Sequence, residues 1–180
     1  MAYPEAFKTL QSYHAAALET ASVIPQEDSG QCHWQGLGFK VSDICLLSEL
    51  GEVSELMPVP RLTALPNVKS WMMGIASVRG RLIPVVNLMD YLQMPVTEPG
   101  TLCRVLVVED GDMIAGFVVD QTLGIKYFRQ DRFEPEVEKS ADGLGRYVTG
   151  RFTGQKQHFQ VIQLKSILRD QKFLAVGHDQ

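Results

Sequence analysis

Cysteine is scarce in this chain, and its few copies stand far apart. The 180 residues contain three cysteines, Cys32, Cys45 and Cys103, and no two of them have C-x-x-C spacing. Structural zinc sites and disulfide frameworks depend on paired cysteines, so neither is indicated. Reduced, widely spaced thiols are typical of a cytoplasmic protein. We therefore predict a cytoplasmic protein without a metal site.

The chain also lacks an excess of positive charge and any long apolar run. Its 17 Lys and Arg residues are outnumbered by 21 Asp and Glu residues, which gives a formal net charge of -4. Nucleic-acid binding depends on a basic field, so we expect no nucleic-acid partner. The longest apolar runs have the length of strands, far short of the roughly 20 residues that cross a membrane. The N-terminus does not resemble a signal peptide, and we expect no direct membrane insertion.

Common catalytic and cofactor-binding motifs are missing as well. The sequence has no Gly-x-Ser-x-Gly elbow, and its glycine pairs at 36–38 and 143–145 lack the strand–helix context of a dinucleotide loop. Asp90 and Asp120 each follow a predicted strand, where a carboxylate usually caps the next turn. Acid–base chemistry by such acids, or by His158, is the alternative. We predict no catalytic residue and no cofactor.

What the chain does contain begins with a helical pattern. Apolar side chains recur at three- and four-residue spacing across residues 4–22, which predicts an amphipathic helix. Proline, glycine and acidic residues at 24–31 predict the end of that helix. We interpret residues 1–30 as an N-terminal helical arm and linker.

From Trp34 onward the pattern favours short strands and tight turns. Strands are predicted at 37–41 and 44–47 around Ser42-Asp43, at 82–88, at 104–109 and 113–119 around 110–112, at 124–128 and at 158–162. Short helical turns are predicted within 49–57, from Pro66 to a C-cap at Gly74, after Asn87, and at 164–170. Many short strands with few helices indicate a mainly β fold of small barrels. The strands form two sets, before and after a polar connection at 93–101, although the last strand can return to the first set.

The segment 74–88 carries a tight turn with two arginines and leads into a β-branched strand. Gly80, directly after Arg79, frees the backbone for a sharp turn, and Pro84 stiffens the next strand. A guanidinium at such a turn is suited to a carboxylate or to backbone carbonyls of a partner protein. The alternative is an internal ion pair, with Glu55 as the candidate acid. The turn indicates recognition and not catalysis.

Four segments in the order of the chain resemble the CheW-like adaptor family, over roughly residues 36–170. They are Val53-Ser-Glu55-Leu56 with Leu65-Pro66, Gly74-x4-Arg79-Gly80-x2-Ile83-Pro84-Val85-x2-Leu88, Ala115-Gly116-Phe117-Val118-Val119-Asp120, and Tyr147-x2-Gly150. One departure is Asn87, which stands where the family usually has aspartate; asparagine can still cap the following turn. Three features look closest to the branch of the family that serves type IV pilus signalling and twitching motility. They are the arm at 1–30, the segment Leu65-Pro-Asn-Val-Lys-Ser-Trp71 and the turn Val78-Arg-Gly-Arg-Leu82.

The resemblance implies two SH3-like five-stranded β-barrels with a shared hydrophobic core at 31–175, divided near 93–101. It implies a non-catalytic scaffold that couples the cytoplasmic tip of a methyl-accepting chemoreceptor to the regulatory domain of a CheA-like histidine kinase, which would recruit the protein to membrane-associated receptor arrays. By motif position, the receptor groove between the barrels would involve Val53, Glu55, Gly74, Arg79 and Gly80.

Two other functions remain open from the residues. One is a flagellar chemotaxis adaptor of the same family. The other is a small β-barrel that binds single-stranded nucleic acid on an aromatic, basic face, against which the negative net charge and the 8% aromatic content count.

Overall fold

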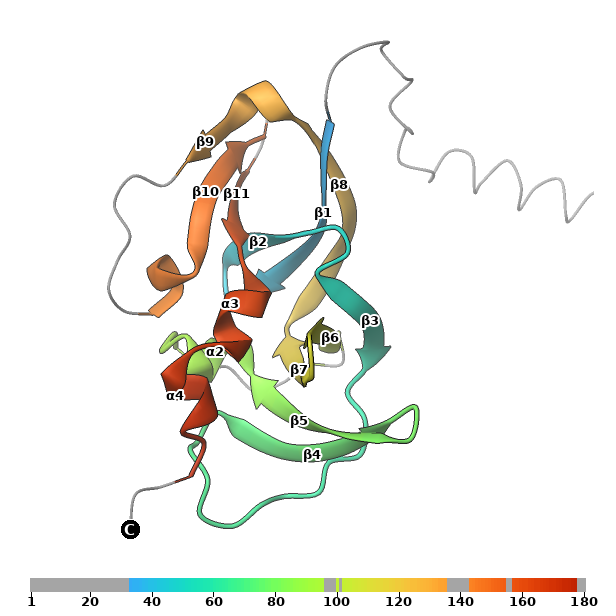
Figure 1. Ribbon diagram of the computed structural model, residues 1–180. Coiled ribbons are helices and arrows are strands. Elements are labelled where there is room, and N and C mark those ends of the chain that lie inside the picture. The colour runs from blue at the N-terminus through green and yellow to red at the C-terminus, as the bar shows by residue number, and fades with distance from the viewer. Residues whose placement is uncertain (1–32, 96–99, 101, 136–142, 155–156, 178–180) are drawn as a thin grey trace, which may run out of the picture. The chain divides into compact units, whose positions relative to one another are not determined.

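Two β-sheets account for most of the described chain (Figure 1). The computed structural model describes residues 33–95, 100, 102–135, 143–154 and 157–177. All of these lie in one compact unit, residues 32–180. The helix predicted at 4–22 falls outside the described residues.

The five-stranded sheet is built from consecutive strands. They are β3 (Val53–Pro58), β4 (Met72–Val78), β5 (Arg81–Asn87), β6 (Arg104–Asp110) and β7 (Met113–Val119). Their order is β3-β6-β7-β5-β4, with β5 and β7 parallel and the other neighbours antiparallel. Two predicted features are confirmed here, the strand of 82–88 and the hairpin around 110–112, in which Gly111 has a φ of 61°.

The six-stranded sheet combines the two ends of the described chain. Its strands are β1 (His33–Val41), β2 (Ile44–Glu49), β8 (Gln121–Arg129), β9 (Phe133–Pro135), β10 (Val148–Thr153) and β11 (His158–Ile162). Their order is β8-β1-β2-β11-β10-β9, and β11 returns to lie parallel to β2. Each sheet therefore takes strands from both sides of residues 93–101, and the expected division of the strands at that connection is wrong.

Short helices follow several strands. They are α2 (Leu88–Tyr91), α3 (Leu164–Leu168) and α4 (Gln171–Leu174), with 3-10 turns η1 (Gln130–Arg132) and η2 (Gly143–Arg146). Asn87 caps α2, because its side chain accepts hydrogen bonds from the backbone N–H groups of Met89 and Asp90. The helical turns predicted after Asn87 and within 164–170 are confirmed.

The two helical turns predicted before residue 75 are wrong. Residues 53–58 form the edge strand β3, and residues 72–78 form the edge strand β4. β3 alternates only between half-buried and exposed positions, and the buried positions of β4 are Gly74, Ala76 and Val78, so large apolar residues mark the period of neither strand clearly. Gly74 does need an unusual backbone, with a φ of 140°, but it uses it within β4 and not at a helix C-cap.

The buried residues form a shared core with a smaller core in each sheet. The shared cluster joins Phe39 and Leu46 of the six-stranded sheet to Leu106 and Phe117 of the five-stranded sheet. A second cluster lies within the five-stranded sheet, around Ile83, and a third lies within the six-stranded sheet. The expected mainly β architecture of two small barrels on a common apolar core is confirmed.

Candidate functional site

The Arg79 turn is a two-residue hairpin between β4 and β5. Val78 and Arg81 form the last pair of this hairpin, and the two residues between them, Arg79 and Gly80, have φ values of 50° and 79°. Positive φ at both central positions is typical of a type I′ turn, which suits the twist of a hairpin. Asn, Asp and Gly usually occupy these positions, because other residues pay a steric cost in the left-handed region. The chain therefore accepts strain to hold an arginine at the tip.

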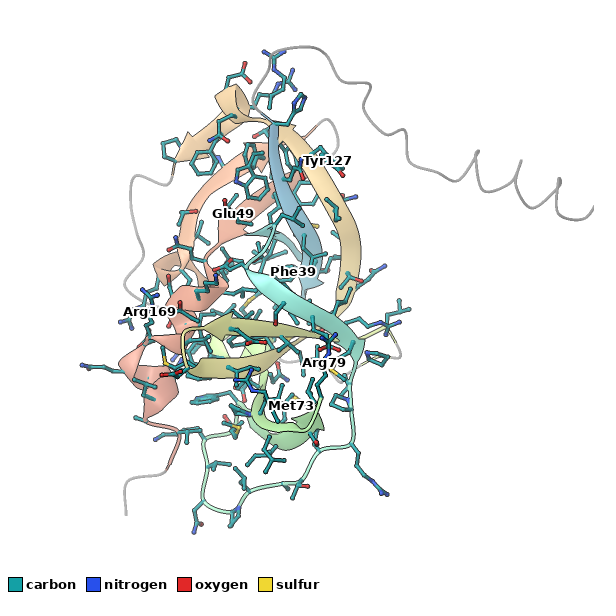
Figure 2. The ribbon with its side chains drawn as sticks, turned by 45° about the vertical axis from the view of Figure 1, so that its right-hand side comes forward. Phe39, Glu49, Met73, Arg79, Tyr127 and Arg169 are labelled. Carbon is teal, nitrogen blue, oxygen red and sulfur yellow. The ribbon has the colours of Figure 1, made fainter. Side chains whose placement is uncertain are left out.

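Arg79 forms an ion pair with Glu55 of β3. The Arg79 Nε lies 2.9 Å from Glu55 Oε2; the arginine side chain is 78% exposed, whereas that of the glutamate is 23% exposed. In the hydrogen-bonded order, β6 and β7 lie between β3 and β5. The ion pair thus joins the turn to a strand on the other side of the sheet, and the internal pair considered from the sequence is present. Figure 2 shows Arg79 in this region, beside β3.

Gly74 makes room for a backbone and not for a partner side chain. It is buried, and a Cβ added to it would lie 2.4 Å from the carbonyl oxygen of Thr63. Thr63 and Ile75 exchange two backbone hydrogen bonds, 2.8 and 2.9 Å long, directly beside it. Gly74 therefore lets the connection after β3 lie against β4, and its contribution to the site is structural.

Val53 begins β3 and packs against the shared core. It is half-buried, and a bulge between Val53 and Glu55 shifts the register of β3 on β6. The structure thus brings Glu55, Arg79 and Gly80 together at one rim of the five-stranded sheet. Val53 lies on the same strand as Glu55, whereas Gly74 has Thr63 and Ala64 as its nearest neighbours.

This arrangement can be compared with known proteins. The family profile described as the CheW-like domain matches residues 35–172. The chain belongs to the CheW-like family. It is 32% identical to Protein PilI of Pseudomonas aeruginosa over 171 residues, which is 95% of this chain and 96% of that protein. It is 33% identical to Protein FrzA of Myxococcus xanthus over 142 residues, covering 77% of this chain and 88% of FrzA.

The fold is also that of a solved structure in the family. The crystal structure of the scaffolding protein TtCheW from Thermoanaerobacter tengcongensis superposes with a TM-score of 0.67 at 20% identity. The match covers 74% of this chain and 90% of that one. The resemblance noted from the four sequence segments, including the likeness to the pilus-signalling branch, is therefore confirmed.

Several features of this CheW-like site were not identified from the sequence. Arg81 Nη1 lies 3.1 Å from Glu109 Oε2, so the second arginine of the turn also has a carboxylate partner. Leu56 and Leu82 are 46% and 73% exposed, one residue after Glu55 and Arg81 respectively. A single exposed leucine on each of β3 and β5 gave no periodic signal, and the distant Glu109 could not be paired with Arg81 without the sheet order.

The side chains considered for catalysis, those of Asp90, Asp120 and His158, have different surroundings. Asp120 accepts a 2.6 Å hydrogen bond from the backbone N–H of Ser42, so it caps the distant β1–β2 turn and not, as was expected, the next turn along the chain. Exposed His158 contacts Thr153, with its Nδ1 3.3 Å from the hydroxyl. Asp90 lines an open cavity of about 590 Å³ beside Lys69. Within the described ranges, no three His, Cys, Asp or Glu side chains gather as a metal site would need.

A buried polar network lies behind α2 and α4. The Tyr147 hydroxyl donates to Asp170, and it also lies 3.0 Å from the Tyr91 hydroxyl. Burial raises the pKa of Tyr91 to about 12 and raises that of Tyr147 further. Burial alone would raise the pKa of Asp170, but Tyr147, the backbone N–H of Lys172 and the Arg146 guanidinium together lower it. The network is a fully hydrogen-bonded support for the core and not a reactive centre.

The described part of the chain contains no helix that is long and apolar enough to cross a membrane.

Proposed function

We propose that this chain is a non-catalytic adaptor that couples a methyl-accepting chemoreceptor to a CheA-like histidine kinase in type IV pilus signalling. The observation that carries the proposal is the exposed Glu55–Arg79 pair at the rim of the five-stranded sheet, in a chain of the CheW-like family. The receptor tip would bind beside this pair, and the kinase regulatory domain would bind another face of the barrels.

The strained turn supports a binding role for Arg79. A surface ion pair is worth only about 0–1 kcal/mol, and the left-handed backbone of Arg79 costs roughly 1–2 kcal/mol in a non-glycine residue. Stability alone therefore does not explain an arginine at a φ of 50°. Strain of this kind persists where a function needs it. An arginine whose fork remains largely exposed can bind carboxylates or carbonyls of a partner while Glu55 holds its position.

The exposed leucines of β3 and β5 support a protein as that partner. Leu56 and Leu82 are exposed on β3 and β5, close in sequence to Glu55 and Arg81. Interfaces between proteins combine apolar contacts with a polar rim, and arginine is common among their central residues. The rim of this sheet offers both kinds of group.

The mechanism follows from holding two partners at once. A scaffold that binds a receptor with one surface and a kinase with another raises the effective concentration of each near the other. The chain then needs no reactive group, and a conformational bias in the receptor reaches the kinase only through the geometry of the complex.

The pilus branch is supported by similarity along nearly the whole chain. The match to PilI includes 95% of this chain and so extends beyond the residues that match the family profile, 35–172. A flagellar chemotaxis adaptor is the second candidate, because proteins named chemotaxis protein CheW also match, at 26% identity over 98 residues for that of Thermotoga maritima and at 22% identity over 165 residues for that of Klebsiella aerogenes.

A titration of the full chain with two kinase regulatory domains tests this proposal. One domain comes from a pilus-system histidine kinase and the other from a flagellar one, and Arg79→Glu is titrated in parallel. We expect selective binding to the pilus kinase. Binding to the flagellar kinase alone would replace the pilus branch with the flagellar one, and binding to neither by a folded protein would contradict the adaptor function.

A further inference from the structure

Glu109 links three strands at the rim that carries Arg79. Its Oε2 receives Arg81 Nη1 at 3.1 Å, and its Oε1 receives the Ser54 hydroxyl at 3.3 Å. The single Ser54 hydroxyl hydrogen is shared with the carbonyl oxygen of Val107, 3.1 Å from Ser54 Oγ. One carboxylate at the end of β6 therefore contacts β3 through Ser54 and β5 through Arg81.

The two arginines of the turn are held from two different strands. Arg79 pairs with Glu55 of β3, and Arg81 pairs with Glu109 of β6, with Gly80 between them. The sheet order separates β3 from β5 by β6 and β7, so the ladder of β4 and β5 does not set the distance from the turn to β3. Apart from the Thr63–Ile75 backbone pair in the connection after β3, side-chain contacts link the turn to β3.

These contacts suit positioning better than they suit stability. The Arg81 and Glu109 side chains are 52% and 41% exposed, and ion pairs at such exposure contribute little to folding. The two ion pairs, Arg79–Glu55 and Arg81–Glu109, nevertheless restrict the movement of the hairpin end relative to β3 and β6. They therefore also restrict the position of the Arg79 guanidinium.

We infer that Arg81 and Glu109 are positioning residues for the receptor-binding site. Their ion pair connects the β4–β5 turn to β6 and, through Ser54, to β3. It thereby keeps the Arg79 guanidinium next to Glu55, where a partner can bind it. This inference rests on the proposed function. It predicts that reversing one of the two charges weakens receptor binding, whereas reversing both together restores it.

A charge-swap series in the full chain tests the inference. The probe is the purified cytoplasmic tip of a pilus-system methyl-accepting receptor, and affinity is measured for Arg81→Glu, Glu109→Arg and the double variant. We expect each single variant to weaken binding roughly threefold to tenfold and the double variant to recover most of the loss. Glu134→Arg is the matched control, because it breaks the exposed Arg151–Glu134 pair of the six-stranded sheet.

A second readout does not depend on the receptor. Spin labels replace the exposed Leu56 and Leu82 in a cysteine-free background, and the distribution of their distances reports the turn relative to β3. The distribution should broaden in both single variants and narrow again in the double variant.

The outcomes separate this inference from the proposed function. Equal receptor affinity in all variants, or a double variant as weak as the singles, overturns the positioning role while leaving the adaptor function intact. Failure of the unmodified chain to bind the receptor tip counts against the adaptor function. In that case an unchanged distance distribution also overturns the positioning role, and a broadened distribution that the double variant restores supports it.

Discussion

The five-stranded and six-stranded sheets have the same strand order, built from different parts of the chain. The order β3-β6-β7-β5-β4 corresponds strand for strand to β8-β1-β2-β11-β10, and β9 is an addition. The parallel pair falls at the same place in both, β5 with β7 and β2 with β11. A short helix follows the equivalent strands, α2 after β5 and α3 after β11. The five-stranded sheet uses consecutive strands, whereas the six-stranded sheet is completed only when the end of the chain returns to its beginning.

A bulge with a glycine recurs in both sheets. Trp71 stands three residues before Gly74, Tyr147 stands three residues before Gly150, and the register of β4 and of β10 shifts just before each glycine. A Cβ on Gly74 would lie 2.4 Å from the carbonyl oxygen of Thr63, and one on Gly150 would lie 2.5 Å from a carbonyl oxygen of β9. In both sheets the glycine admits a further segment at the edge.

The two sheets differ in how the helix after the equivalent strand begins. Asn87 caps α2 with its own side chain, whereas Gln163 before α3 makes no such hydrogen bond. The backbone N–H of Lys165 donates instead to Glu52 Oε1, 2.8 Å away. Glu52 is 9% exposed, and its other oxygen accepts a 2.6 Å hydrogen bond from the Ser48 hydroxyl.

The difference shows how one sheet supports the site on the other. Glu52 lies in the connection from β2 to β3, where the chain passes between the sheets, and Val53 follows it directly. By binding α3, Glu52 fastens the start of β3 to the six-stranded sheet. The common strand order accounts for the fold of both sheets. Contacts between distant segments, such as that of Glu52 with α3, make the stability of each barrel depend on the other.

The largest effect is expected where the repeated glycines meet backbone. Gly74→Ala should lower the free energy of unfolding by about 2–4 kcal/mol, because the new Cβ would overlap the backbone of Thr63. Gly80→Ala is the control: it has a φ of 79° but nothing within 4 Å, so about 1 kcal/mol is expected. Urea unfolding measures both. Equal losses would show that backbone conformation, and not close approach, defines the bulge.

The next effect concerns the two helix starts. Glu52→Ala should cost about 1–3 kcal/mol in unfolding free energy, because it removes the partner of a backbone N–H and of the buried Ser48 hydroxyl. Asn87→Ala should cost about 1 kcal/mol, as the loss of a local cap. Chemical denaturation of both variants checks the order. A larger loss for Asn87→Ala would mean that the local cap, and not the distant one, is the more important contact.

A pH dependence is expected in the network around Tyr147, which precedes β10 as the apolar Trp71 precedes β4. The folded-state pKa of Asp170 is lowered by its partners, so this carboxylate stabilises the fold above the ordinary aspartate pKa of about 3.9. That stability is lost as the pH falls through the lower folded-state pKa. Asp170→Asn should reduce the unfolding free energy at neutral pH by about 1–3 kcal/mol and flatten its decline below about pH 4.

Unfolding curves at several pH values distinguish this from a general acid effect. Asp131→Asn serves as the control, because Arg129 lowers the pKa of Asp131 at an exposed position. An acid-induced loss of stability in Asp170→Asn as steep as in the unmodified protein would contradict the assignment.

The smallest stability effect is expected at the site itself. Arg79→Glu removes an exposed ion pair and should change the unfolding free energy by no more than about 1 kcal/mol, while weakening receptor binding. Calorimetric melting and receptor titration of the same preparation check both parts. A molten or aggregated variant would give Arg79 a structural role instead.

The parts of the fold that sequence reasoning predicted are those with local causes. The turn at 110–112 and the cap at Asn87 each depend on residues within a few positions of one another. The strands β3 and β4 were misread as helical turns, because each lies at a sheet edge and their partners set their conformation. The mixing of strands across 93–101 follows from parallel and antiparallel pairs between distant segments, which no local pattern contains.

The candidate site likewise has contacts that the sequence could predict and contacts that it could not. The motif identifies the turn, and the 2.9 Å contact between Arg79 and Glu55 confirms the internal partner that the sequence suggests. The Glu109–Arg81 pair joins residues 28 positions apart, and Glu52 reaches α3 across 113 positions. Such contacts depend on sheet order and burial, so they could not be predicted from spacing.

The most direct test of the adaptor function is sedimentation velocity on three purified proteins: this chain, the receptor tip and the regulatory domain of the pilus-system kinase. The account predicts that the receptor tip and the kinase domain sediment together only when the chain is present, and that Arg79→Glu retains the kinase but releases the receptor. Co-sedimentation of receptor and kinase without the chain, or failure of the folded chain to join them, would contradict it.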